Sequence, residues 1–393
     1  MIEWKKVKAI NFIDFNPRES LQKNTMAKKV AMEQLQPFIR DISDYEIAPF
    51  NGGSKFRNGD TIMARITPCL ENGKTAQINI LDEGEIGFGS TEFIVLREKP
   101  GISDKNFIYY LALSPILREA AIKSMAGTSG RQRVQQGVLN DIEFYAPPLS
   151  EQIEIGNTLK GLDDKISLNN RINKTLEEMA QAIFKSWFVD FEPWGGVMPE
   201  DWYIVTIGEF ADEIKNGGTP SRNNPEFWNS NDIPWIKTGE IHNCPIIQAE
   251  EYISYAGLKQ SSAKLLPINS VLIALYGATA GKVGLLRFMA TTNQACCAMI
   301  CGSINKAIYL YQYLLINQEY IVNLSIGSAQ QNLSKETISN LQIILPTEEI
   351  IKNLPFVELY DKIENNLKEI AHLAAIRDAL LPKLMSGEIE IKI

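Results

Sequence analysis

The pattern that decides the fold lies in residues 150–190, which read SEQIEIGNTLKGLDDKISLNNRINKTLEEMAQAIFKSWFVD. Mostly apolar side chains, with two asparagines among them, recur there at steps of three and four: Leu159, Leu162, Ile166, Asn169, Asn173, Leu176, Ala180, Ile183 and Trp187. Such a heptad seam predicts a long helix that pairs with another helix. An amphipathic helix packed on its own domain, which usually has a wider apolar stripe, is the alternative.

A second seam of the same phase occurs near the C-terminus. It consists of Phe356, Leu359, Ile363, Asn366, Ile370, Leu373, Arg377, Leu380 and Leu384. Matched length and phase favour an antiparallel pair of the two helices. Asn169 and Asn366 interrupt the seams 197 residues apart. We hypothesise that they face each other across a pseudo-twofold axis and fix the helix register; the alternative is that each side chain reaches water.

The two helices belong to an internal repeat with a period near 198 residues. Residues 4–7 recur as residues 202–205, and residues 139–142 recur as residues 338–341. This period is too long for a solenoid and indicates duplicated domains.

Each repeat begins with about 150 residues that are rich in short apolar runs and punctuated by Gly, Pro and Asn. Runs such as 62–66 and 271–276 have the length of strands. Residues 107–125 and 306–325 read as helices between the strands. We therefore predict an α/β (α+β) fold with two strand-rich domains joined by two long antiparallel coiled-coil-like helices. The predicted segments are residues 1–149, 150–198, 199–346 and 347–393.

The predicted helices carry end signals. Ser150 and Thr347 each precede an acidic first turn, and short hydroxyl residues are favoured N-caps. Residues 192–196 contain Pro and Gly and end the first helix, and Ser386-Gly387 ends the second.

Composition bounds the possible functions. The 393 residues carry a net charge of −8, so any bound nucleic acid must contact local basic patches. The sequence has no apolar run of membrane length and no leader-like start, and we expect a cytoplasmic protein. It has five cysteines and two histidines. Cys297 and Cys301 lie in or beside an apolar run, so we expect buried thiols and no metal site.

Catalytic motifs are weak or missing. Residues 277–283 read GATAGKV and are similar to a phosphate-binding loop. That motif needs four residues between the glycines and a Ser or Thr after the lysine, but here three residues separate the glycines and Val283 follows. A hairpin tip fits better. No methyltransferase, helicase or nuclease motif is evident, so we predict no catalytic residue.

The order of several motifs resembles one known family. The motifs are residues 87–93, 147–152, 184–191, 218–221, 233–236, 276–284 and 292–294. Together they resemble the target-recognition domains and helices of specificity subunits in type I restriction–modification systems. The resemblance covers nearly the whole chain. The first domain departs from it, because it lacks the Thr-Pro-Ser and Ile-Pro-Trp pieces of the second.

The resemblance implies a function without catalysis. Each recognition domain would read one half of a bipartite double-stranded DNA site, and the paired helices would set the gap and dock two methyltransferase subunits. Two motor/nuclease subunits would complete the complex. No cofactor is expected in this chain, because S-adenosylmethionine, ATP and magnesium would sit on the partners. Two alternatives are a DNA-modifying enzyme fragment with unrecognised motifs and a structural adaptor without sequence specificity.

Candidate DNA contacts follow from side-chain chemistry. Phosphates attract Lys and Arg, and base edges are read by Arg, Asn and Gln. In the first domain the candidates are Lys55, Arg57, Arg65, Lys74, Arg131, Gln132 and Arg133. In the second they are Ser221, Arg222, Lys237, Tyr276, Thr279, Lys282, Gln330, Gln331 and Asn332. The loops at Arg131 and Gln330 occupy matching repeat positions. The alternative for each residue is a solvated loop side chain.

Overall fold

The computed structural model describes residues 4–127, 130, 132–324 and 332–391. The chain divides into two compact units. The first combines Met1–Leu168 with Ile370–Ile393, and the second is Asn169–Glu369. The boundaries fall inside both long helices, so each unit contains part of each helix. The division into recognition domains and spacer helices at residues 149, 198 and 346 therefore stays a prediction.

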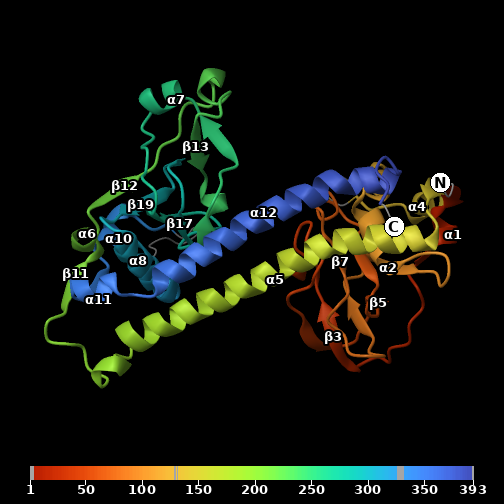
Figure 1. The fold of residues 1–393 in the computed structure, drawn as a ribbon, viewed down its shortest axis with the longest axis horizontal. Helices are drawn as coiled ribbons and strands as arrows, with labels where there is room; N and C mark the ends of the chain where they lie inside the picture. The colour runs from red at the N-terminus through yellow and green to blue at the C-terminus, as the bar shows by residue number, and fades with distance from the viewer. Residues whose placement is uncertain (1–3, 128–129, 131, 325–331, 392–393) are drawn as a thin grey trace. The chain divides into compact units, whose positions relative to one another are not determined.

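The two long helices are α5, Leu149–Phe188, with 40 residues, and α12, Phe356–Ser386, with 31 residues. Figure 1 shows α5 in yellow-green and α12 in blue. They pair antiparallel. In the second unit Asn173 of α5 bonds Asn366, whereas Asn169 bonds Glu369, so the numbers fall on one helix as they rise on the other. The predicted pair of long antiparallel helices is confirmed.

The predicted helix starts need correction. The helix α5 begins at Leu149, so Ser150 lies inside its first turn and is not the N-cap. Thr347 precedes only the short helix α11, Glu348–Lys352. The chain then leaves the helix before Pro355, and α12 begins at Phe356. Proline lacks an amide donor and disfavours helical geometry in the preceding residue, which explains the break.

The first unit has two four-stranded sheets and a two-stranded pair. One sheet has the order β2-β9-β6-β7: Ile13–Phe15, Phe93–Glu98, Thr61–Ala64 and Thr75–Gln77. The other has the order β4-β3-β8-β5: Glu46–Pro49, Met26–Val30, Gly87–Gly89 and Ser54–Phe56. Strand β1, Lys5–Lys8, pairs antiparallel with β10, Glu143–Ala146. The helices are α1, Ala9–Phe12; α2, Lys105–Leu113; α3, Pro115–Lys123; and α4, Gln136–Asp141.

Strand β6 shows why this unit has two cores. Its four residues are all buried, because successive side chains point to opposite faces and both faces are covered. Met63 packs in the core that includes Phe107 of α2. Its neighbour Ile62 packs in the core that includes Phe56 of the other sheet.

The second unit repeats this plan. A five-stranded sheet has the order β12-β19-β16-β17-β14: Glu213–Asn216, Cys296–Ile300, Val271–Ala274, Val283–Leu286 and Cys244–Ile246. A smaller sheet has the order β15-β13-β18: Glu251–Ile253, Ile233–Ile236 and Thr291–Thr292. Strand β11, Tyr203–Thr206, pairs antiparallel with β20, Gln342–Leu345. The helices are α6, Ile207–Phe210; α7, Tyr255–Lys259; α8, Ile304–Ile316; α9, Gln318–Asn323; and α10, Lys335–Ser339.

Two smaller predictions concern this sheet. Residues 277–282 connect the antiparallel strands β16 and β17, so the segment that is similar to a phosphate-binding loop is a hairpin tip. Cys296 and Cys297 are buried within β19, where burial raises the pKa of the Cys297 thiol to about 12. That thiol stays protonated at neutral pH and packs as an apolar group.

Candidate nucleic-acid interface

Three of the first-domain candidates, Lys55, Arg65 and Arg133, lie at or beside Thr91 and Glu92. Lys55 and Arg65 line a groove of about 470 Å³ together with Thr91, the residue before Glu92. The ammonium group of Lys55 donates to the carbonyl oxygen of Glu19. Arg133 pairs with both carboxylate oxygens of Glu92, at 2.6 to 3.0 Å. This hydrogen-bonded guanidinium lowers the pKa of Glu92.

The backbone explains why these side chains meet. The carbonyl of Arg65, just after β6, accepts from the amide of Val134 at 2.9 Å, and the carbonyl of Gln132 accepts from Thr67 at 3.1 Å. The segment that carries Gln132 and Arg133 therefore lies alongside the end of β6. It places one polar loop beside the groove that Lys55 and Arg65 line.

Two first-domain candidates lie apart from this group. The ammonium group of Lys74 donates to the carbonyl of Met32 at 2.9 Å. Arg57 lies beyond β5, where its amide donates to Asp60 at 2.8 Å. Arg131 lies outside the described residues.

The second-domain candidates form two groups. In one, Tyr276 forms a backbone bridge with Asn332, and the amide of Lys282 donates to the carbonyl of Thr279 at 2.9 Å. In the first unit the matching bridge joins Ile66 to Arg133. The loop before α4 thus meets the end of β6 in the first unit, and the loop before α10 meets the end of β16 in the second. Gln330 and Gln331 lie outside the described residues.

The other group contains Ser221, Arg222 and Lys237. The Nη1 of Arg222 donates to Glu251 at 2.6 Å, and Lys237 contacts Glu250 at 2.9 Å and Glu251 at 3.0 Å. Hydrogen bonds from these cations, Arg222 first, lower the pKa of the Glu251 carboxyl. The Thr219 hydroxyl contacts the Gln294 side chain. The next residue after Gln294 is Ala295, and its carbonyl accepts from the amide of Leu275 at 2.8 Å. The segments that carry Ser221 and Tyr276 are therefore joined through residues 294 and 295.

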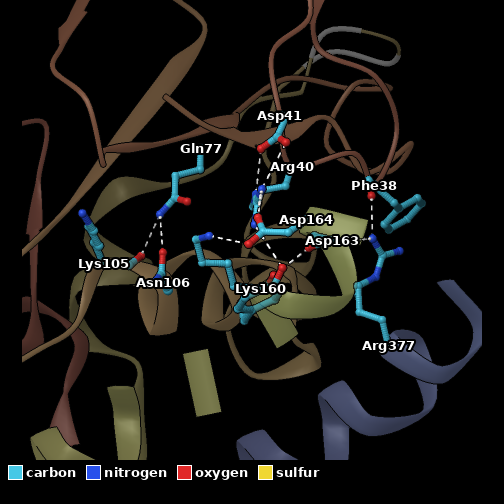
Figure 2. Close-up of polar contacts among 11 residues, drawn as sticks. Phe38, Arg40, Asp41, Gln77, Lys105, Asn106, Lys160, Asp163, Asp164 and Arg377 are labelled. Atoms are coloured by element: carbon cyan, nitrogen blue, oxygen red, sulfur yellow. Dashed lines mark hydrogen bonds and ion pairs between the residues drawn. The ribbon is translucent and has the colours of Figure 1, made fainter. Parts of the chain in front are cut away.

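A polar network in the first unit, with Arg40, Asp163 and Arg377 buried, joins the domain body to both long helices (Figure 2). Arg377 of α12 donates to Asp163 of α5 at 2.7 Å and to the carbonyl of Phe38 at 3.1 Å. Arg40 pairs with Asp164 of α5 at 2.7 Å and with the neighbouring Asp41, also at 2.7 Å. The loop that carries Phe38 and Arg40 is thereby held against both helices.

The second unit has a similar contact from a different residue. Arg287, directly after β17, pairs with Asp361 and Glu364 of α12, each at 2.5 Å. Sequence reasoning missed Arg40, Arg287 and Asp163. Among the seam residues of the second helix only Arg377 is charged, and a charge in a buried seam requires a partner; this points to a residue such as Asp163 but not to Arg40 or Arg287.

The hypothesis that Asn169 and Asn366 face each other is wrong in its geometry. Asn169 donates to Glu369 at 2.9 Å, and Asn366 donates to Asn173 at 2.7 Å. The late start of α12 explains the difference, because the helix midpoints then lie near residues 168 and 371 and Asn366 is about one turn away. Both asparagines are buried, so the alternative that each reaches water is also wrong. Their role in fixing the register stays a prediction.

The described residues contain neither a metal-binding cluster nor a membrane-spanning helix. Within residues 4–127, 130, 132–324 and 332–391, no three His, Cys, Asp or Glu side chains gather as a metal site would require. None of the helices in this part of the chain combines the length and the apolar character needed to cross a membrane.

Comparison with known proteins identifies the family. The family model for the type I restriction modification DNA specificity domain matches residues 1–178 and, a second time, residues 199–373. The specificity subunit of type I restriction enzyme HindI from Haemophilus influenzae is 28% identical, over 89% of this chain and 90% of that protein. The specificity subunit of MjaIX from Methanocaldococcus jannaschii is 27% identical, over 73% and 69%.

The fold agrees with a solved structure. The S subunit of a type I restriction–modification system from M. genitalium has a TM-score of 0.61 at 17% identity, covering 100% of this chain and 97% of that one. The chain therefore belongs to the family of type I restriction–modification DNA specificity subunits, and the predicted family is confirmed.

Proposed function

We propose that this chain is the sequence-reading subunit of a type I restriction–modification complex and that each strand-rich domain reads one half of a bipartite DNA site. The observation that carries the proposal is the doubled fold. Each repeat brings a polar loop to the end of its central strand, at Arg133 in one unit and at Asn332 in the other. Residues of these types read base edges and contact phosphates.

The long helices are proposed to set the gap between the half-sites and to dock two methyltransferase subunits. Antiparallel helices stabilised by buried polar contacts act as a stiff spacer, because their side chains cannot slide without losing hydrogen bonds. Two motor/nuclease subunits are proposed to join the same complex. We propose that the chain itself is not catalytic and that S-adenosylmethionine, ATP and magnesium are held by its partners in the cytoplasm.

Methylation mapping tests this proposal. The chain is co-expressed with its cognate methyltransferase subunit in a host without adenine methylation, and the host DNA is sequenced for modified adenine. The expected result is one bipartite motif with a fixed unspecified gap, lost when this chain is omitted. A stable complex that modifies no site would contradict sequence reading. Methylation by the chain alone would instead support the enzyme-fragment alternative.

A further inference from the structure

We propose that Arg222 reads a guanine base in the half-site of the second domain. This inference rests on the proposed function and assigns a specific chemistry to one residue of that site. Three features of Arg222 support it. Its guanidinium is stacked on aromatic rings, two of its donors are unpaired among the described residues, and the charges around it cancel.

The Arg222 guanidinium lies over two indole rings that pack against each other. Its Cζ atom is 3.4 Å from the ring centroid of Trp228 and 4.9 Å from that of Trp235. The two indoles pack edge to face at 4.9 Å. Their Nε1 groups donate to the carbonyls of Ser221 at 3.1 Å and Gly218 at 3.0 Å. Stacking on rings that are themselves anchored fixes the guanidinium plane before any ligand arrives.

One edge of this guanidinium is open. The Nη1 group donates to Glu251 at 2.6 Å, while the Nε and Nη2 donors have no partner among the residues that the structure describes. The side chain is 50% exposed. The Nε–Nη2 edge presents two parallel N–H groups, which match the O6 and N7 acceptors of guanine in the major groove.

Other arginines of the chain show what this edge does when a partner is present. Arg97 uses Nε and Nη2 to bind both oxygens of Asp60, each at 2.6 Å. Arg133 uses the same two groups on Glu92. Their forks are occupied within the protein. By comparison, the Nε–Nη2 fork of Arg222 has no partner among the described residues, so it can bind an external pair of acceptors without first breaking an ion pair.

The local charge favours a base over a phosphate as the ligand. Arg222 and Lys237 are balanced by Glu250 and Glu251, so the cluster brings two positive and two negative charges. Affinity for the DNA backbone comes from net positive charge that displaces counterions. A neutral cluster with one rigid donor pair contributes little to that term and much to discrimination between bases.

The test compares methylation motifs. Arg222→Ala and Arg222→Lys are each co-expressed with the methyltransferase subunit, and the modified sites are mapped. We expect one guanine position in one half-site to become degenerate, with its preference over other bases falling about ten- to a hundredfold, while the other half-site and the gap stay unchanged. Lysine should restore the preference at most in part, because its ammonium lacks the planar, stacked fork of the guanidinium.

Lys264→Ala is the matched control, because it removes an exposed positive charge next to Ala263, which packs with Ile233 and Trp235 of the same small sheet. It should leave the motif unchanged. Thermal unfolding and complex formation by each variant check that it is folded. Retention of every guanine preference by both folded Arg222 variants would overturn the inference while the wild-type motif upholds the proposed function. A wild-type chain that yields no bipartite motif would overturn both.

Discussion

Arg40 and Arg287 bind aspartates at equivalent positions of the two long helices. The guanidinium of Arg40 lies 2.7 Å from Asp164 of α5, and that of Arg287 lies 2.5 Å from Asp361 of α12. The two arginine side chains are 8% and 6% exposed. They do not come from equivalent places, because Arg40 precedes β4 whereas Arg287 follows β17. Each domain body is therefore fixed to a long helix by an arginine–aspartate ion pair. The arginine comes from a different part of the fold in each domain.

We predict that these two arginines position the recognition domains on the helices. Replacing either with alanine removes the ion pair and lets the domain body rotate on its helix. Methylation mapping should then return both half-site sequences unchanged, together with methylation at sites whose gap is one base pair longer or shorter. The gap should stay strict in Lys123→Ala, which breaks the exposed pair with Glu119. A strict gap in both arginine variants would show that the ion pairs serve stability alone.

The buried pair of Asp163 and Arg377 should contribute strongly to stability. These side chains are 4% and 5% exposed, and Asp163 also accepts from the hydroxyl of Tyr110 at 2.6 Å. Removing one partner leaves a buried charge without its counterion, which costs about 3–5 kcal/mol. We expect Arg377→Met to lower the free energy of unfolding by about that amount in urea denaturation.

The control for Arg377→Met is Lys352→Ala. It breaks an exposed i,i+4 pair with Glu348 and should cost at most about 0.5 kcal/mol. A loss for Arg377→Met as small as that of the control would mean that water screens the pair in solution.

The sequence predicted the helices better than the contacts that hold them. The heptad seams located α5 and α12, because the spacing of apolar residues follows directly from helical geometry. The ion pairs were not predictable, since Arg40 and Asp164 are separated by 124 residues and pair only once the domain has folded. The start of α12 was missed because Thr347 resembles an N-cap, whereas Pro355 decides where the long helix begins.

The structure brings some of the predicted site residues together and leaves others apart, and their contact with DNA stays a prediction. Arg65 and Arg133 lie close together because the segment that carries Arg133 is hydrogen-bonded to the backbone just after β6, where Arg65 lies. Lys74 did not join them, since its ammonium group turns to the carbonyl of Met32. A strand position fixes the backbone, but the direction of a long, flexible side chain depends on neighbours that the sequence does not identify.

The amide pair of Asn173 and Asn366 should matter for register more than for stability. Asn366 donates to Asn173 at 2.7 Å, and the Nδ2 of Asn173 is buried without a partner in the part of the chain that the structure describes. Asn366→Leu alone leaves the side-chain oxygen of Asn173, Oδ1, unpaired as well, which costs about 1–3 kcal/mol. Replacing both residues with leucine should restore stability to wild type or above, because two apolar side chains then pack in the seam.

A double-mutant cycle measures this coupling by urea unfolding of the two single variants and the double variant. A coupling energy near zero would contradict the pairing. The double variant should also tolerate shifted helix pairing, because no polar group then penalises a slipped register. Cysteine crosslinking across the helices at neighbouring positions reports such a shift, and a single crosslink register in the double variant would show that the apolar seam fixes the alignment by itself.

Glu177 of α5 should make the stability of the second unit depend on pH. Burial, aided by the neighbouring Glu178, raises the pKa of its carboxyl to about 7, and the nearby Cys244, Tyr311 and Tyr360 supply no positive charge. The folded chain therefore binds the proton more tightly than the unfolded chain does. That stabilisation is complete below the unfolded pKa, near 4.3, and is lost as the pH rises through 7.

Glu177→Gln should remove this dependence and raise the free energy of unfolding at pH 8 by about 1–2 kcal/mol, a value reduced by the partial exposure of the carboxyl. Urea unfolding at pH 5 and pH 8 provides the measurement, with the exposed Glu358→Gln as the control. Equal slopes of stability against pH in wild type and Glu177→Gln would show that Glu177 is ionised at no cost and that this end of the helix pair is hydrated.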